Sequence, residues 1–396
     1  MTHRATGFLD TFLGVLRQKN LHRDLRTIQG PQGPWVEVDG RRVLNLCSNN
    51  YLGLASHPQL AEAAATAART WACGSGASRL VCGNMALHEL LERRLADFKR
   101  TEAALLYSSG YAANLGIISA LVGRGDFVFS DAFNHASIID GCRLSQAEVI
   151  PFPHNDMAAL EERLLDGSRS SPRARRLIAV DGVFSMDGDL APLPQLAELA
   201  ERYEAMLMVD EAHATGVLGP EGRGVVAHFG LEGNVPIIMG TLSKALGGFG
   251  AFAAGSLQLR EYLVNTSRSF IFSTALPPPV VASALAALDL LQADPGLPGR
   301  LQEKARLFRA RLGEMGYDTM SSATQIIPVL VGKIDMALEM SHRLLEEGVL
   351  TVAIRPPTVP QGTSRLRVTV TATHSQEDLD FALEAFRKVG RRVGLI

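Results

Sequence analysis

Apolar and polar positions alternate in blocks along most of this 396-residue chain. Between about residues 60 and 280, short apolar runs are separated by stretches with the spacing of amphipathic helices, such as Leu193–Tyr203. Strands that alternate with helices in this way form a mostly parallel, doubly wound sheet. Such strands are covered on both faces, so they are apolar throughout. The predicted strands are Ala103–Tyr107, Phe127–Phe129, Leu177–Val180, Met206–Val209 and Ile237–Met239.

The N-terminal part of the chain has a different pattern. Apolar residues recur at helical spacing from Phe8 to Leu16, which predicts an amphipathic helix that docks on another surface. Short strands are predicted at Trp35–Val38 and Arg42–Leu46. We treat residues 1–58 as an N-terminal segment that precedes the large, ligand-binding domain.

A second change follows the three prolines Pro277–Pro279 and the long helical stretch Val280–Gln292. From about residue 297 the pattern is one of amphipathic helices with strands at Gln325–Val331 and Ser364–Thr371. We therefore expect a large domain over residues 59–290 and a smaller α+β domain over residues 291–396.

Composition narrows the possible functions. The chain has 39 basic and 41 acidic residues, a formal net charge of −2, so charge gives no reason to expect nucleic acid or an anionic membrane as partner. No apolar run reaches the roughly 18 residues of a membrane span. The four cysteines form no Cys-x-x-Cys pair and no histidines cluster at zinc-ligand spacing, so no metal is expected. We expect buried cysteines in a reducing cytoplasm: Cys47, Cys73, Cys82 and Cys142.

Polar residues stand where two predicted strands end. Met206–Val209 leads into Asp210 and His213, and Ile237–Met239 leads into Lys244. Parallel sheets bind ligands at the carboxyl ends of their strands, and successive strands are often neighbours, so these side chains are expected to face one site. Only six lysines occur, and the other five lie in helical or surface-like contexts.

A lysine flanked by small residues at such a place is a candidate imine-forming amine. Pyridoxal 5′-phosphate (PLP) needs that amine together with a buried carboxylate beside its pyridine nitrogen, and Asp210 suits this role. His213 is placed to reach the ring oxygen or to support the carboxylate, and His135 is a candidate for stacking on the ring. Ser109 and Gly110 open a helical stretch where backbone N–H groups bind a phosphate.

Five segments resemble motifs of the α-oxoamine synthases, which are PLP enzymes of fold-type I, and the resemblance covers nearly the whole chain. It implies a mostly parallel, doubly wound large domain, a smaller α+β C-terminal domain and PLP bound to Lys244. The segments are Asn49–Leu54, Asn134–Ser137, Asp181–Gly188, Asp210–Gly216 and Thr241–Gly247.

The resemblance also implies roles for individual residues. Lys244, His135, Asp210 and His213 would be catalytic, with Asp210 on the pyridine nitrogen, His213 on the ring oxygen and His135 on the ring face. Ser273 and Thr274 would reach the phosphate from the other subunit, which implies a homodimer with shared active sites. The further residues expected to contact or adjoin the cofactor are Ser109, Gly110, Tyr111, Ser185, Thr241 and Ser243.

Members of the family condense an amino acid with an acyl thioester and release CO₂. Arg355 and Arg367 match substrate-carboxylate arginines, because a guanidinium binds a carboxylate with two hydrogen bonds, and Asn49 is a further substrate candidate. The segment Ile354–Pro360 favours the branch that joins L-alanine to a pimeloyl-CoA or pimeloyl-carrier-protein thioester. Arg23 and Arg26 are interpreted as solvated surface charges.

Other functions stay open at this point. Gly33–Val38 and Asp181–Phe184 are also similar to the branch that joins glycine to acetyl-CoA, and a dual activity is a further alternative. A fold-type I aminotransferase would share the lysine and the aspartate but would return an amino group to the cofactor. A PLP-sensing module is disfavoured, since the chain has no basic stripe and no helix-turn-helix head.

Overall fold

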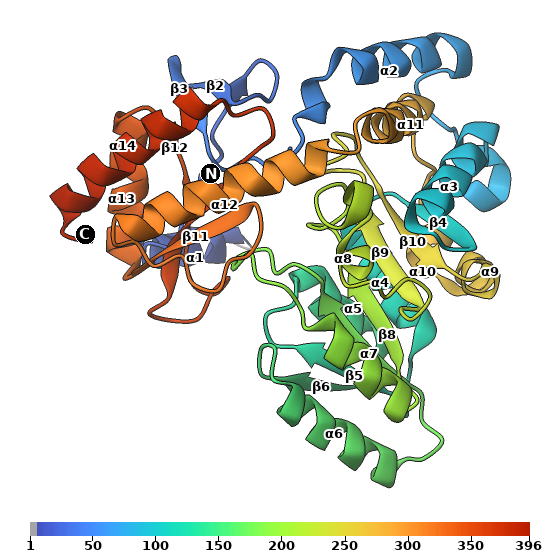
Figure 1. Ribbon diagram of the computed structural model, residues 1–396. Coiled ribbons are helices and arrows are strands. Elements are labelled where there is room, and N and C mark those ends of the chain that lie inside the picture. The colour runs from blue at the N-terminus through green and yellow to red at the C-terminus, as the bar shows by residue number, and fades with distance from the viewer. Residues whose placement is uncertain (1–5) are drawn as a thin grey trace. The chain divides into compact units, whose positions relative to one another are not determined.

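The computed structural model describes residues 6–396 and divides into two compact units (Figure 1). The central unit is Asn49–Glu303, and the terminal unit combines the chain up to Ser48 with Lys304–Ile396. The two ends belong together because strand β3 (Arg41–Asn45) pairs in parallel with β12 (Val349–Leu350). The N-terminal segment is thus not separate, and the borders lie at residues 48 and 303 instead of 58 and 290.

The central unit contains a seven-stranded sheet in the order β4-β10-β9-β8-β7-β5-β6. Strand β10 is antiparallel to both of its neighbours, and the other pairs are parallel. The mostly parallel, doubly wound sheet predicted from the sequence is therefore confirmed. The strands are β4 (Ala103–Tyr107), β5 (Phe127–Asp131), β6 (Glu148–Phe152), β7 (Arg176–Asp181), β8 (Met206–Asp210), β9 (Ile237–Thr241) and β10 (Ala251–Gly255).

Helices cover this sheet because its strands are apolar on both faces. Helices α4 and α5 pack on one face in a core that includes Ile117, Ile138 and Met208, and α6 and α7 contact β5, β6 and β8. The helices are α2 (Pro58–Trp71), α3 (Ala86–Lys99), α4 (Gly110–Leu121), α5 (Ala136–Ser145), α6 (Met157–Ser170), α7 (Leu193–Arg202), α8 (Val225–His228), α9 (Leu257–Thr266), α10 (Arg268–Ile271) and α11 (Pro278–Ala293), with short turns η2 (Leu54–Ser56), η3 (Arg79–Gly83) and η4 (Pro220–Gly222).

The terminal unit is the smaller α+β unit expected from the sequence. One sheet has the order β1-β2-β3-β12 and the other the order β11-β14-β13. Helix α12 begins in the central unit and continues into the terminal one. The elements not yet given are α1 (Phe8–Gln18), β1 (Ile28–Gln29), β2 (Trp35–Val38), β11 (Ile326–Gly332), β13 (Val352–Ile354), β14 (Ser364–Thr369), α12 (Leu297–Glu314), α13 (Ile334–Glu346) and α14 (Gln376–Val393).

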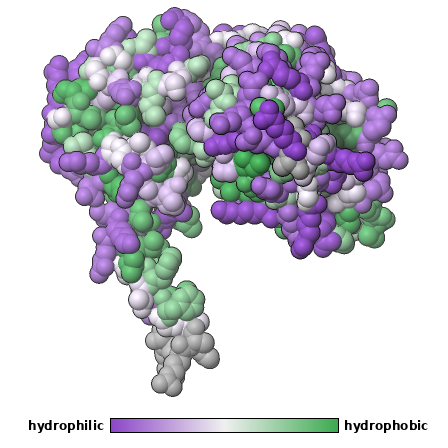
Figure 2. Space-filling model, turned by 90° about the horizontal axis from the view of Figure 1, so that it is seen from below, coloured by the Kyte–Doolittle hydropathy of each residue, from purple (hydrophilic) through white to green (hydrophobic). Residues whose placement is uncertain are grey.

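The predicted N-terminal helix forms as α1, and none of its residues is buried. Phe8 and Phe12 are exposed, and Figure 2 shows hydrophobic residues (green) at the N-terminal end of the described chain. Its docking on another surface stays a prediction.

Among the described helices, none by itself has the length and apolar composition to span a membrane. A pair bent by 80°, Pro278–Ala293 with Leu297–Glu314, meets that test only when both helices are taken together.

Candidate active site

The predicted site residues of the central unit gather at one edge of the sheet. Because β10 reverses direction between β9 and β4, the carboxyl ends of β4, β5, β7, β8 and β9 share an edge. Asp181 and Asp210 end adjacent strands and are partners in the register. Both are buried. Burial, followed by the charge of Asp210, raises the pKa of Asp181 well above its usual value.

A chain of hydrogen bonds leads to Lys244. The Nζ atom of Lys244 lies 2.7 Å from Nε2 of His213, and Nδ1 of His213 lies 2.7 Å from the Tyr51 hydroxyl. That hydroxyl donates to Oδ1 of Asn49 over 3.0 Å. Tyr51 therefore accepts from Nδ1, which leaves the Nε2 lone pair facing Lys244. In this arrangement His213 can accept a proton from the lysine ammonium group.

The carboxylate of Asp210 is fixed by its neighbours. Asn114 of α4 donates from Nδ2 to Oδ2 over 2.8 Å, and the backbone N–H of Ala212 donates to Oδ1 over 2.8 Å. Asn114 also donates to Ser137. The sequence interpretation gave His213 as a possible support for this carboxylate, whereas the structure shows Asn114 in contact with it.

His135 caps the N-terminus of α5. Its Nδ1 lies 2.7 Å from the Ser137 hydroxyl, and its backbone N–H donates to Oδ2 of Asp181 over 2.6 Å. Burial lowers the pKa of the His135 imidazole, and the charge of Lys244 lowers it further against the opposing charge of Asp210. A neutral imidazole here suits stacking on an aromatic ring, the role that the sequence predicts.

The start of helix α4 lies directly after β4. The Ser109 hydroxyl accepts from the N–H of Ala112 over 3.1 Å, and the first helical bond runs from Ala113 to the Ser109 carbonyl. The N–H groups of Gly110 and Tyr111 precede that bond, so the helix end is suited to an anion. The Tyr111 side chain is directed elsewhere, because its hydroxyl donates to Asp140 of α5.

The other predicted hydroxyls lie in the turns at the ends of β7 and β9. Thr241 and Ser243 both donate to the carbonyl of Gly250, over 2.9 and 3.1 Å, and so shape the loop that carries Lys244. Ser185 is buried in a turn that the Phe184 N–H closes by donating to Asp189. Their contact with the cofactor stays a prediction.

Ser273 and Thr274 follow helix α10. They line a small pocket together with Arg79 and with Ser108, which directly follows β4. Thr274 also forms a β-bridge with Ser78. Their predicted reach into another subunit's phosphate site stays a prediction.

The predicted substrate arginines belong to the terminal unit. Arg367 is buried on β14, and Arg355 follows β13 and donates to the carbonyl of His22 over 2.5 Å. Burial lowers the pKa of Arg355, and the charge of Arg23 adds to this effect. Burial also raises the pKa of Cys47 to about 11, against the opposing charges of Arg367 and Arg26. Arg23 and Arg26 are exposed as expected, but the charge of Arg23 acts on Arg355 and that of Arg26 acts on Cys47.

The residues of the central unit fit PLP. A buried carboxylate, a lysine amine, an imidazole of lowered pKa and a helix N-terminus without side chain at Gly110 are the partners that the pyridine, aldehyde, ring face and phosphate require. Asn114 supplies a second indication, since its Oδ1 is buried without a hydrogen-bond partner in the described part of the chain.

The structure corrects one expectation from the sequence and adds to what was predicted for two residues. Lys99 lies at the end of helix α3, in one of the contexts predicted for it, but it is buried and contacts Glu211, Thr215 and the Arg223 carbonyl. Of the four cysteines expected to be buried, Cys142 is buried, Cys47 is half-buried, and Cys73 and Cys82 are exposed. Sequence reasoning also missed Asn114, because an asparagine inside an apolar helix gives no signal until the fold places it beside Asp210.

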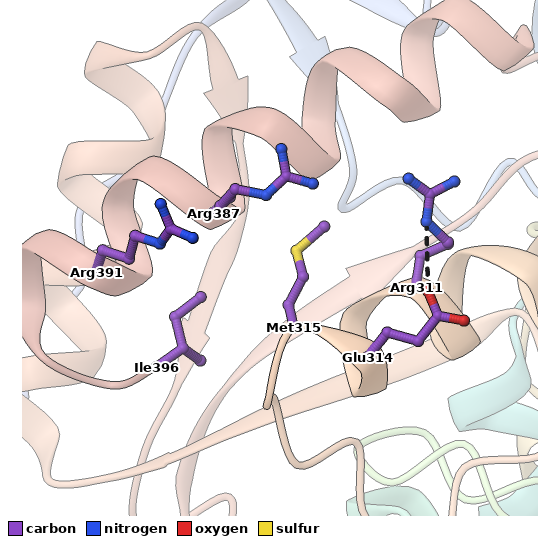
Figure 3. Close-up of a pocket in the computed structure, with 6 residues that line it drawn as sticks. All are labelled: Arg311, Glu314, Met315, Arg387, Arg391 and Ile396. Atoms are coloured by element: carbon purple, nitrogen blue, oxygen red, sulfur yellow. Dashed lines mark ion pairs between the residues drawn. The ribbon is translucent and has the colours of Figure 1, made fainter.

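The terminal unit also contains a pocket of its own. Figure 3 shows it between α12 and α14, and none of the predicted site residues line it. Arg311 pairs with Glu314 at 3.6 Å and Arg387 pairs with Glu384, so two of its arginines have carboxylate partners. Its lining residues are Arg311, Glu314, Met315, Arg387, Arg391 and Ile396.

Comparison with known proteins agrees with this site. The model of the aminotransferase class I and II family matches residues 41–386, so the chain belongs to that family, whose fold-type I members use PLP. An 8-amino-7-oxononanoate synthase from Geobacter sulfurreducens is 57% identical over 97% of this chain and 98% of its own length. One from Thermoanaerobacter pseudethanolicus is 49% identical over 98% of both.

Solved structures show the same relationship. A serine palmitoyltransferase from S. paucimobilis with bound PLP superposes with a TM-score of 0.93 at 34% identity, covering 99% of both chains. An 8-amino-7-oxononanoate synthase from Francisella tularensis gives 0.76 at 28% identity over 89% of this chain and 99% of its own. Within the class I and II family, the chain belongs to the α-oxoamine synthases, as its motifs indicate.

Proposed function

We propose that this chain is an 8-amino-7-oxononanoate synthase, which condenses L-alanine with a pimeloyl thioester. The new carbon–carbon bond joins the alanine Cα to the acyl carbon, the carboxylate leaves as CO₂, and the thiol leaves with one proton from solution. The observation that carries the proposal is the lysine amine 2.7 Å from His213 at the strand edge that also holds buried Asp210. The near full-length relatives favour the alanine branch over the glycine branch.

Each residue has a defined task in this reaction. PLP, when bound, supplies an electron sink for the negative charge that develops at the amino acid Cα. Asp210, held by Asn114 and Ala212, would keep the pyridine nitrogen protonated. Lys244 would bind the cofactor aldehyde and carry the Cα proton, while His213 and Tyr51 orient its amine. Ser109, Gly110 and Tyr111 would hold the phosphate through the start of α4.

The terminal unit offers cations for the carboxylates of the substrates. Arg355 and Arg367 would bind a carboxylate, and the nearby charges of Arg23 and Arg26 add to the positive field there. A pimeloyl chain with a free terminal carboxylate would gain from this field, whereas an acetyl group has no charge to place in it. This favours the pimeloyl donor over acetyl-CoA.

A homodimer with shared active sites is part of the proposal. Ser273 and Thr274 stand beside exposed apolar side chains, since Phe272 is 71% exposed and Val81 is 77% exposed. The Ser78–Thr274 bridge brings these two segments together. Exposed apolar patches of this kind often mark protein interfaces.

The test is a paired thiol-release assay with PLP-loaded protein. L-alanine with pimeloyl-CoA is expected to release thiol faster than glycine with acetyl-CoA. Lys244→Ala is expected to keep the fold and to lose both the imine absorbance and turnover. A preference for glycine and acetyl-CoA would instead identify a glycine C-acetyltransferase, and formation of pyridoxamine phosphate from alanine alone would identify an aminotransferase. Parental turnover by Lys244→Ala would contradict the assigned chemistry.

A further inference from the structure

His154 is held between two carboxylates in the central unit. It follows β6, and its Nδ1 lies 3.0 Å from Oδ1 of Asp131 while its Nε2 lies 2.8 Å from Oδ2 of Asp189. A carboxylate accepts hydrogen bonds, so both ring nitrogens must donate and the ring must be an imidazolium. Burial alone lowers the pKa of His154, but the hydrogen bonds and charges of the two aspartates raise it to about 9.

Two aromatic rings enclose this imidazolium. Phe133 stacks on it with 4.4 Å between centroids and 17° between planes, and Phe184 approaches with its edge at 4.4 Å and 89°. Phe133 lies two residues before His135, and Phe184 is directly followed by Ser185. The rings that contact His154 therefore belong to the two loops that carry predicted cofactor residues.

The carboxylates connect the same two loops. Asp131 ends β5 and accepts the N–H of Phe133 over 2.8 Å, and Asp189 accepts the Phe184 N–H through its carbonyl over 3.1 Å. Asn155 adds a third connection, because its N–H donates to Asp131 and its Nδ2 donates to Asp189. Removing the positive charge would leave two buried carboxylates facing an uncharged ring.

We propose that His154 is a positioning residue. In its protonated form it holds the His135 loop (residues 131–137) and the Ser185 loop (residues 181–191) at the spacing that the PLP ring requires. It acts through these loops and contacts no reacting atom. The inference deepens the function proposed above, since it rests on the PLP site placed there. It adds a structural cation behind the cofactor site that Lys244, Asp210 and His213 do not supply.

The pH dependence has a definite sign. The folded pKa of about 9 lies above the ordinary value of 6.5, so the contribution of His154 is complete below about pH 6.5 and is lost as the pH rises through 9. The charged groups that contact it are Asp131 from β5 and Asp189 from the turn after β7. On its own segment, the carboxylate of Asp156 caps α6 by accepting from Ala159.

The experiment measures PLP affinity of wild type and His154→Gln by spectroscopic titration from pH 7 to 10.5. At pH 7 we expect a Kd about tenfold higher in the variant, the factor typical of a supporting contact behind a bound group. The ratio of the two Kd values is expected to approach 1 above pH 9, because the wild type then loses the same charge. Groups that titrate in both proteins cancel in this ratio. A ratio of 1 at pH 7, or one independent of pH, would overturn the proposal.

The matched control is His342→Gln, an exposed histidine that pairs with Glu346 and should leave the Kd unchanged. Hydrogen exchange of the PLP-free proteins at pH 7 supplies a readout without cofactor. Peptides over residues 131–137 and 181–191 should exchange about tenfold faster in His154→Gln. Equal rates would overturn the proposal that His154 holds these two loops. If wild type fails to bind PLP while the rates differ, the proposed function is wrong, but the role of His154 in holding the two loops stands.

A second variant covers the case in which His154→Gln does not fold. Asp189→Asn keeps the imidazole and removes one of the two carboxylates, so the His154 pKa falls. The pH at which PLP affinity declines should then move below that of wild type. An unchanged midpoint in a folded Asp189→Asn protein would contradict the proposal.

Discussion

Single residues at this site are fixed by the hydrogen bonds that their neighbours leave open to them. Tyr51 donates to Asn49, so it can only accept from His213, and this choice aims the other ring nitrogen at Lys244. Lys99 is another buried residue whose side chain is fixed by its hydrogen-bond partners. It contacts Glu211, whose Oε1 accepts from the Val226 N–H over 2.7 Å, within the motif that begins at Asp210.

Lys99→Met is expected to lower the free energy of unfolding of the PLP-free protein by about 3–5 kcal/mol, because it leaves the Glu211 carboxylate buried and unpaired. Urea unfolding measures the change. Adding Glu211→Gln to the variant should restore much of the loss. The exposed pair Lys388–Glu347 is the control, and Lys388→Met should cost less than about 1 kcal/mol. Equal costs for the two lysine variants would show that the buried pair has no special role.

At the scale of elements, the loops that carry the motifs can meet only because two glycines allow it. Gly216 has a φ of +86°, and a Cβ there would lie 2.8 Å from the Cβ of Ala245, next to Lys244. Gly247 has a φ of +64°, and a Cβ there would lie 2.4 Å from the backbone nitrogen of Ala55. The lysine loop thus packs against the Asp210–Gly216 loop and against the end of the Asn49–Leu54 segment.

Gly247→Ala is expected to separate the lysine loop from residues 54 and 55 and to weaken PLP binding at least about tenfold, since small shifts of a positioned group are costly. Spectroscopic titration gives the Kd. Gly233→Ala is the matched control, because Gly233 also has a positive φ of +86° but has open space around it. Its cost should be confined to backbone strain of about 1 kcal/mol. If both variants bind PLP as wild type does, the close approach has no functional weight.

At the scale of the whole molecule, the proposed active site takes residues from two chains. The relatives align with this chain over nearly their full lengths. Phe272 and Val81 are exposed beside Ser273 and Thr274, which supports the proposed dimer.

Complementation between inactive variants tests the shared site. Lys244→Ala removes the amine, and the double variant Ser273→Ala with Thr274→Ala removes the hydroxyls proposed to serve the partner. Refolding the two inactive proteins together should restore up to about a quarter of wild-type activity, because half of the molecules would be mixed dimers with one intact site of two. Thiol release with alanine and pimeloyl-CoA measures it. If each site were built within one chain, every site in a mixed dimer would carry one of the two defects, so activity no higher than that of either variant alone would contradict the shared site. A mixture of each variant with wild type serves as the reference.

Several elements could be predicted because the apolar pattern of their own residues is enough to indicate a strand. Ala103–Tyr107 and Trp35–Val38 match β4 and β2 residue for residue. Two strands of the central sheet were missed for physical reasons. β6 contains Pro151 and lies at the sheet edge, where proline is tolerated, and β10 consists of three alanines, one glycine and one phenylalanine, of which only the phenylalanine favours strands.

The sequence by itself determined the class of fold and the chemical groups of the site, because strand periodicity and the residues at strand ends are local properties. Lys244, Asp210 and His213 could be found in this way. Only the tertiary structure decided which groups lie beside these residues and beside the loops that carry the other candidate site residues. Asn114, Tyr51 and His154 come from separate elements, and each became informative when the fold placed it within hydrogen-bond distance of a partner far away in the chain.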